Sequence, residues 1–111
     1  MVNFYNLQLF GGVKVEVKVR FFTTLREIIG KREETFSLPD EETATVETVL
    51  TLLSRKYGVP FTDYVYDPQS GQPRGFLQFL VNGASTQTLL GTQTPLNNGD
   101  VLAILPPVGG G

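Results

Sequence analysis

The sequence contains no cysteine, no histidine and no tryptophan. Without cysteine there is no disulfide, no thiolate metal site and no sulfur nucleophile within the chain. Without histidine the chain lacks the side chain that most often moves protons near neutral pH. Any catalysis would depend on carboxylates, lysines or hydroxyls, and no two acidic residues are spaced convincingly for acid and base chemistry. We therefore expect no catalytic residues, no metal site and no self-contained active site.

Long apolar runs and a strong net charge are also missing. No run approaches the ~20 residues that a membrane-spanning helix needs, and the first residues lack the basic start and cleavage site of a signal peptide. The formal net charge is -2 at pH 7, with acidic and basic residues interspersed, so there is no basic stripe for nucleic acid. The 111 residues thus predict one cytoplasmic domain with no membrane or nucleic-acid partner.

The first half of the chain shows the patterns of two strands and two helices. Valines and a phenylalanine alternate with charged residues over residues 13–21, which predicts a strand with one buried face. A short helix is expected over residues 23–30, with threonine hydroxyls able to cap its start, and an antiparallel strand over residues 32–39. Apolar residues at helical spacing predict the main helix between a Thr45 cap and Gly58.

The second half is expected to contain an exposed loop and two further strands. Turn-forming residues dominate residues 59–75, where one turn of helix near Tyr64 is the alternative to a continuous loop. A strand follows over residues 76–81 and ends at the turn signal Asn82-Gly83. The final strand, residues 100–105, is apolar on both faces, which favours a central position parallel to the first strand. The fold class is therefore α+β, a β-grasp (ubiquitin-like) mixed sheet packed on one main helix.

Four stretches, taken together, resemble a known family. They are VKVRFFTTLREIIGKREETFSL, TVETVLTLLSRKYG, VNG and TPLNNGDVLAILPPVGGG, in that order. The chain resembles the MoaD/ThiS family of ubiquitin-like sulfur carriers, and within it the small subunit of molybdopterin synthase and the archaeal small modifier proteins. The resemblance covers residues 13–111. It departs from the family at Gly109, where another small residue is usual, and in residues 1–12, which precede the family's normal start.

This resemblance implies a role for the C-terminal carboxylate of Gly111. A MoeB-like adenylating enzyme of the ubiquitin-activating type would adenylate it with ATP and Mg²⁺ and convert it to a thiocarboxylate. The sulfur would pass to a pterin precursor held by a MoaE-like large subunit of molybdopterin synthase. Alternatively, the activated Gly111 would be joined to lysines of other proteins, as in the archaeal modifiers. A β-grasp binding module with an inert tail is the third interpretation, and the thiamine branch of the family fits the motifs less well.

The C-terminal residues 106–111 suit that role physically. An activated carboxylate needs no side chain of the carrier, which fits a chain without cysteine or histidine. Six extended residues span roughly 20 Å, enough to enter a neighbouring active site. Pro106 and Pro107 stiffen the exit from the last strand, whereas Gly109 and Gly110 keep the flexible tail slim.

Two further hypotheses concern the surface and the start of the chain. We expect a partner-binding surface at the following residues: Phe22, Leu80, Pro106, Pro107 and Val108, with Leu102 or Ile104 as further candidates. Core packing is the alternative for Phe22. Solvated surface charge is the preferred interpretation of Arg20, Arg26 and Arg74, with pairing to an acidic partner as the alternative. Residues 1–12 are predicted to be a poorly ordered extension, with an edge strand as the alternative, before a domain over residues 13–105.

Overall fold

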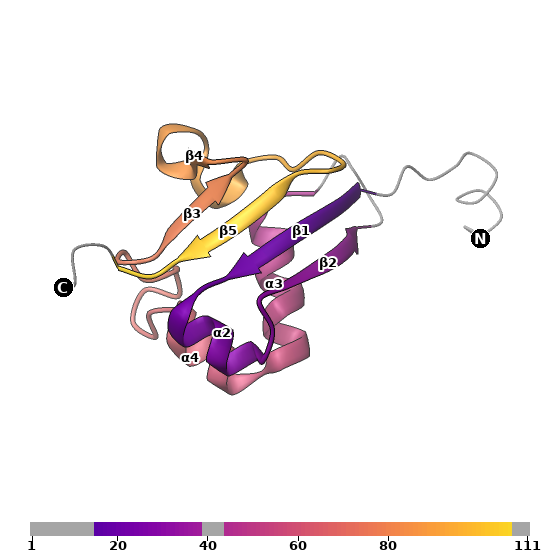
Figure 1. Cartoon of the computed structure of the whole chain (residues 1–111). Coiled ribbons are helices and arrows are strands. Elements are labelled where there is room, and N and C mark those ends of the chain that lie inside the picture. Colours follow the sequence, from indigo (N-terminus) through magenta and orange to yellow (C-terminus); the bar gives the residue numbers. More distant parts are fainter. Residues whose placement is uncertain (1–14, 39–43, 108–111) are drawn as a thin grey trace, which may run out of the picture.

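Five strands form one mixed sheet in the computed structural model, which describes residues 15–38 and 44–107. Their order across the sheet is β2 (Glu33–Leu38), β1 (Val15–Phe21), β5 (Val101–Leu105), β3 (Gln78–Val81) and β4 (Ala84–Ser85). β5 runs parallel to β1 and antiparallel to β3, as Figure 1 shows. The predicted central position of the last strand is therefore confirmed.

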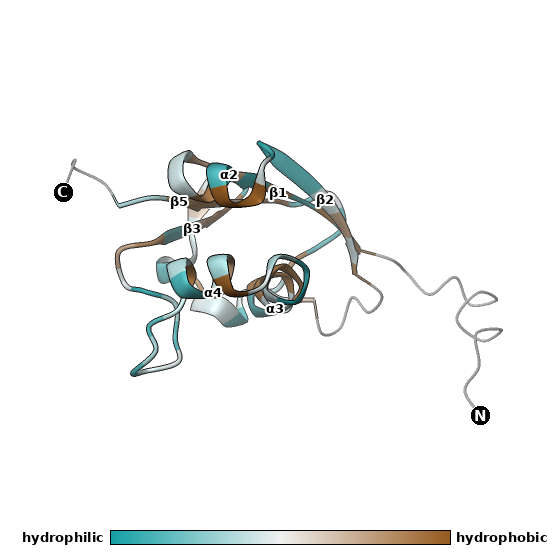
Figure 2. Ribbon diagram, turned by 90° about the horizontal axis from the view of Figure 1, so that it is seen from below, coloured by the Kyte–Doolittle hydropathy of each residue, from teal (hydrophilic) through white to brown (hydrophobic). Residues whose placement is uncertain are grey.

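Helices cover one face of this sheet. α3 (Val46–Tyr57) and α4 (Val59–Val65) lie against it, and α2 (Thr23–Ile29) lies at the end of the sheet where β1 ends (Figures 1 and 2). Two short 3-10 helices, Thr86–Thr88 and Gly91–Gln93, follow β4. This is the β-grasp arrangement that the sequence predicts. Within the described ranges, no helix is long and apolar enough to cross a membrane.

The core lies between the sheet and the helices. Every second residue of β1 is buried and the residues between them are exposed, as expected for a strand with one solvent-facing side. The register pairs Val19 with Leu102 and Phe21 with Ile104, and residues paired across neighbouring strands share a face. Leu102 and Ile104 therefore point into the core, where they are 0% and 1% exposed. The hypothesis that either contributes to a partner-binding surface is wrong.

The main helix, α3, has the predicted ends because its cap and its stop signal are both used. The Thr45 hydroxyl accepts a hydrogen bond from the Thr48 backbone N–H at 3.3 Å, and the Thr48 hydroxyl accepts one from the Thr45 N–H at 3.2 Å. This reciprocal pair satisfies two backbone donors that a helix start leaves free. At the other end Gly58 takes a φ of 72°, a conformation that favours glycine.

The segment after α3 differs from the prediction of a continuous exposed loop over residues 59–75, and the alternative of a helical turn near Tyr64 is confirmed. Its first seven residues form α4, in which Phe61 and Val65 are fully buried. These two side chains are four residues apart and so lie on one face of the helix. Pro60 is compatible with the helix because the first-turn N–H groups have no partner within a helix. Burial of this apolar pair outweighs the nearby turn-forming residues, and only residues 66–75 form the expected loop.

The start of α2 differs as well. Phe22, not a threonine, occupies the cap position, and no side chain caps the helix. Thr23 has a φ of 47°, which is unusual for a β-branched residue and turns the chain sharply from β1 into α2. The predicted end is confirmed, since Gly30 lies at φ 84° and donates its N–H to the Arg26 carbonyl at 2.7 Å.

Residues 1–14, 39–43 and 108–111 lie outside the described part of the chain. The N-terminal extension over residues 1–12 and the separate tail over residues 106–111 therefore stay predictions.

Candidate functional site

The last strand leads the chain out of the middle of the sheet. Its final rung pairs Leu105 with Gln78 of β3, and two prolines follow. Proline has no backbone N–H and a fixed φ, so the hydrogen-bonded ladder cannot continue through Pro106 and Pro107. Pro106 is half-buried and Pro107 exposed, and the chain reaches the surface beside the end of β1 (Figure 1). The predicted tail residues, Val108, Gly109, Gly110 and Gly111, lie outside the described residues.

The outer face of the sheet, away from α3 and α4, carries an apolar strip. Val101, Ala103 and Leu105 alternate with the buried residues of β5 and are half-buried on this face. Leu80 of β3 is also half-buried and pairs with Ala103 in the register. We call these four residues the outer strip. It runs along β5 to the prolines, so it ends where the tail leaves the domain.

Phe22 belongs to the same face of the sheet. It follows β1 directly and stays extended, with φ -131° and ψ 148°. Since successive side chains of an extended chain point to opposite faces, Phe22 points to the side of Arg20, away from buried Phe21. Phe22 is half-buried. The structure therefore places the predicted surface residues Phe22 and Leu80 on one face, with β5 between their strands.

Two arginines lie over the Phe22 ring. The guanidinium carbons of Arg20 and Arg26 are each 5.8 Å from the ring centroid. Such stacking places a cation against the electron-rich ring face. Arg26 is held further by a hydrogen bond from its Nε to the Phe21 carbonyl at 3.3 Å. Arg74 lies elsewhere, in the loop before β3, where its Nη2 donates to the Asp63 carbonyl at 3.0 Å.

A cluster centred on Glu34 contains the strongest perturbation of pKa values in the described residues. The Glu34 side chain is 11% exposed, forms ion pairs with Lys31 and Lys56, and accepts a hydrogen bond from the Tyr57 hydroxyl. Burial acts to raise the pKa of Glu34, but the hydrogen bonds from Lys56 and Tyr57 and the two lysine charges outweigh it, so the pKa is lowered. Burial and the Glu34 carboxylate raise the pKa of Tyr57 to about 12. The cluster links β2 to α3. Both pKa shifts move the groups away from titration near neutral pH, so we interpret the cluster as structural.

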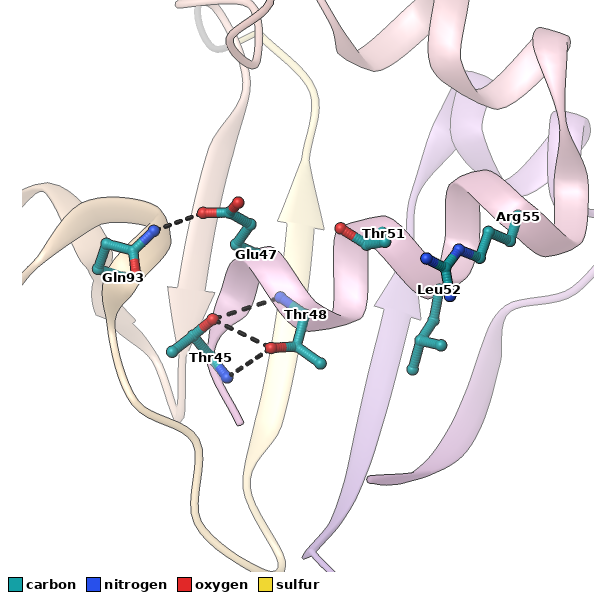
Figure 3. Close-up of a pocket in the computed structure, with 7 residues that line it drawn as sticks. All are labelled: Thr45, Glu47, Thr48, Thr51, Leu52, Arg55 and Gln93. Carbon is teal, nitrogen blue, oxygen red and sulfur yellow. Dashed lines mark hydrogen bonds between the residues drawn. The ribbon is translucent and has the colours of Figure 1, made fainter. Parts of the chain in front are cut away.

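An open groove of about 630 Å³ runs along the exposed side of α3 (Figure 3). Its lining residues are Thr45, Glu47, Thr48, Thr51, Leu52, Arg55 and Gln93. Several of their polar groups already bind one another: Gln93 donates to Glu47, and Thr45 and Thr48 form the helix cap. Within residues 15–38 and 44–107, no group of three or more acidic side chains could hold a metal ion. The lining residues of the groove therefore do not indicate a catalytic site.

One exposed aromatic residue near the tail was not singled out from the sequence. Phe76 is 45% exposed and its ring centroid lies 6.2 Å from that of Tyr64 on α4. It precedes by two residues the Gln78 that pairs with Leu105, so it lies at the end of the sheet where the tail leaves. The signal was present in the sequence, because Phe76 is a bulky apolar residue directly after a stretch of turn formers.

Comparisons with known proteins agree with this fold. The chain is 33% identical over 97 residues to small archaeal modifier protein 3 of Haloferax volcanii, covering 87% of this chain and all of that protein. The solution structure of small archaeal modifier protein 1 from Methanosarcina acetivorans matches with a TM-score of 0.72 and 35% identity, over 90% of this chain and 100% of that one. A Pyrococcus furiosus structure described as a molybdopterin converting factor, subunit 1, matches with a TM-score of 0.65 and 28% identity, over 85% and 99%.

The family assignment rests on a match that runs from the end of the first strand to the last residue of the chain. The ThiS family model matches residues 19–111, which contain the end of β1, the helices α2, α3 and α4, β5 and the glycines after it. The resemblance inferred from the sequence motifs is thereby confirmed. The chain belongs to the ThiS family and has the ubiquitin-like β-grasp fold of its MoaD-type and small-modifier relatives.

Proposed function

We propose that this protein is a carrier whose Gly111 carboxylate is activated by a separate adenylating enzyme. The observation that carries the proposal is the route of β5. A central strand that pairs with a neighbour on each side ends at Leu105, two prolines stop the ladder, and the family match continues from there to Gly111. A tail anchored in the middle of the sheet leaves from a rigid base, and roughly 20 Å of extended chain is enough to place its end in another protein's active site.

The chemistry of the tail needs only its backbone. The Gly111 carboxylate attacks the α-phosphorus of ATP, an O–P bond forms and pyrophosphate leaves, with Mg²⁺ bound by the enzyme and the nucleotide. A nucleophile then attacks the acyl carbon and AMP leaves. A sulfur nucleophile supplied by a partner yields a thiocarboxylate, and a lysine amine yields an isopeptide. The chain thus acts as a covalently modified substrate, and the catalytic groups belong to its partners.

The first candidate use of the activated tail is sulfur delivery in molybdopterin synthesis. In that role a MoaE-like large subunit of molybdopterin synthase accepts the tail, and the sulfur passes to a pterin precursor. The similarity to the molybdopterin converting factor of Pyrococcus furiosus supports this use.

The second candidate use is conjugation to lysines of other proteins. Two relatives that match nearly the whole chain at 33% and 35% identity are named small archaeal modifier proteins. These similarities favour the modifier role at least as strongly as sulfur delivery. Both uses begin with the same adenylation of Gly111.

Intact-protein mass spectrometry of the chain purified from its native cells tests which product forms. Replacement of one carboxylate oxygen by sulfur adds about 16 Da, because the two elements differ by that mass. Glycine remnants on lysines of other proteins, found after digestion, would instead identify the modifier role. A tail that is unmodified under all growth conditions, with no conjugates, would contradict the proposal.

Variants of the tail test activation itself. In ATP–pyrophosphate exchange with the adenylating enzyme of the same organism, we expect Gly110→Ala and Gly111→Ala to lower the rate strongly. The methyl group of alanine would occupy space in the enzyme channel that the glycine tail enters. The matched control is Ala84→Gly at the exposed start of β4, which changes one methyl group far from the tail exit. A normal exchange rate with both tail variants would show that the tail glycines are not needed for activation, and would contradict the proposed mechanism.

A further inference from the structure

We propose that Arg20 and Arg26, stacked on Phe22, form a docking site for carboxylates on the enzyme that activates the tail. We call Phe22 and these two arginines the arginine pair. The proposal rests on the proposed function, since it names the chemistry of the surface that receives the tail. For Arg20 and Arg26 it takes up the alternative of pairing to an acidic partner, in place of solvated surface charge.

The geometry of β1 and α2 places both arginines against the same aromatic ring. Arg20 is the last outward-facing residue of β1, and Phe22 continues the same face. The sharp turn at Thr23, with φ 47°, starts α2 and returns Arg26 over the ring. Both guanidinium carbons lie 5.8 Å from one centroid, so they are at most twice this distance apart. Both guanidinium groups are therefore held against the same ring before any partner binds.

Neither arginine of the pair forms an ion pair with a residue in the described ranges. Glu33 faces Arg20 across the β1–β2 ladder, but its carboxylate forms an ion pair with Lys18 at 3.5 Å. Among the ion pairs in the described ranges, the acidic partners are Glu33 and Glu34, and both bind lysines. Carboxylates on a partner would therefore find two positive charges in this region that have no ion-pair partner within the described ranges.

The neighbourhood of the pair indicates what kind of surface binds there. Arg20 pairs in the register with Ala103, so the pair borders the outer strip of Leu80, Val101, Ala103 and Leu105. Arginine beside a partly buried aromatic and an apolar strip is the composition of a protein interface centre. The net charge of -2 makes a nucleic-acid backbone a poor alternative. We therefore expect the matching surface of the partner to carry carboxylates beside an apolar area, next to the channel that receives the tail.

Equilibrium binding without ATP tests the proposal directly. The full-length chain is titrated into the purified adenylating enzyme of the same organism, by calorimetry, at low salt and at about 0.5 M salt. We expect Arg20→Gln/Arg26→Gln to raise Kd roughly tenfold at low salt, because charge pairs at interfaces contribute strongly when close. High salt should raise the wild-type Kd and reduce the difference from the variant, because salt screens the interaction.

The matched control is Arg55→Gln, which removes the same charge from the exposed side of α3, on the other side of the sheet. It should bind like wild type. Arg20→Gln alone is also measured, because Arg26 contacts the Phe21 carbonyl and its loss can weaken α2. Thermal melting confirms that each variant is folded at the temperature of the titration.

The outcomes separate the arginine pair from the proposed function. Unchanged binding by Arg20→Gln and by the double variant, an equal loss in Arg55→Gln, or an enzyme that does not bind the wild-type chain would each overturn the docking proposal. A tenfold, salt-sensitive loss supports it. If that loss is seen but ATP–pyrophosphate exchange shows no adenylation of Gly111, the arginine pair is supported as a binding site for the enzyme. The proposed function, activation of the tail, is then contradicted.

Discussion

The burial of Phe61 predicts a large loss of stability on its removal, although the sequence pattern suggests an exposed loop at this position. Phe61 lies in α4 and is 0% exposed. A buried phenylalanine removes about 150 Å² from water, and at about 25 cal/mol per Å² this corresponds to about 4 kcal/mol. Large-to-small substitutions of buried phenylalanines cost about 3–5 kcal/mol, which agrees with this estimate. Phe61→Ala should therefore lower the free energy of unfolding by about 4 kcal/mol.

Urea unfolding followed by far-UV circular dichroism measures this change, with the free energy extrapolated linearly to water. Val59→Ala is the control on the same helix, because Val59 is 67% exposed and its loss should change stability by about 0.5 kcal/mol or less. If Phe61→Ala costs less than about 1 kcal/mol, residues 59–65 do not pack as described. The segment would then be the surface loop that the sequence suggests.

Three further predictions concern the Glu34 cluster and the main helix. Because the pKa of Glu34 is lowered from its ordinary 4.5, its carboxylate stabilises the fold above that pH and the contribution is lost as pH falls through the lowered value. Glu34→Gln should cost roughly 1–2 kcal/mol at pH 7 and flatten the loss of stability in acid, measured by urea unfolding from pH 6 to pH 2. The pKa of Tyr57 is raised from 10.0 to about 12. The stability that its protonated hydroxyl contributes to the fold is therefore fully present below pH 10 and is lost as pH rises toward 12. Tyr57→Phe should remove that alkaline step in thermal melts, and an identical step in the variant would contradict the assignment. Thr45→Ala should lower the free energy of unfolding by about 1 kcal/mol, whereas Thr51→Ala on the exposed side of α3 should not.

Much of the fold follows from patterns within single segments. The alternation in β1 depends on one buried face, and the spacing of apolar residues in α3 depends on one buried stripe, so both are visible locally. The central position of β5 follows because both of its faces are apolar. For β5, however, the sequence leaves open which apolar residues face the core. That choice depends on the register with β1, which pairs Leu102 with Val19 across a long sequence separation.

The parts that were missed depend on contacts that form only in the folded chain. α4 has seven residues and contains a proline, so its helical signal is weak until Phe61 and Val65 find the core. A local signal was nonetheless present: proline in the first turn and apolar residues four apart. For the arginine pair, the sequence offers pairing with an acidic partner only as an alternative and does not indicate that the two arginines share one ring. The spacing of Arg20, Phe22 and Arg26 has no regular period, because a strand ends and a helix begins between them.

The parallel pairing of β1 and β5 also has a mechanical consequence. The start of β1 and the end of β5 lie at opposite ends of this pair of strands. A force that pulls the tail away from the start of β1 therefore loads all the hydrogen bonds between the two strands at once, in shear. In a hairpin pulled at its open end, by contrast, the bonds break one after another. Traction applied between the tail and the start of β1 is thus resisted by several hydrogen bonds together and not by one bond at a time.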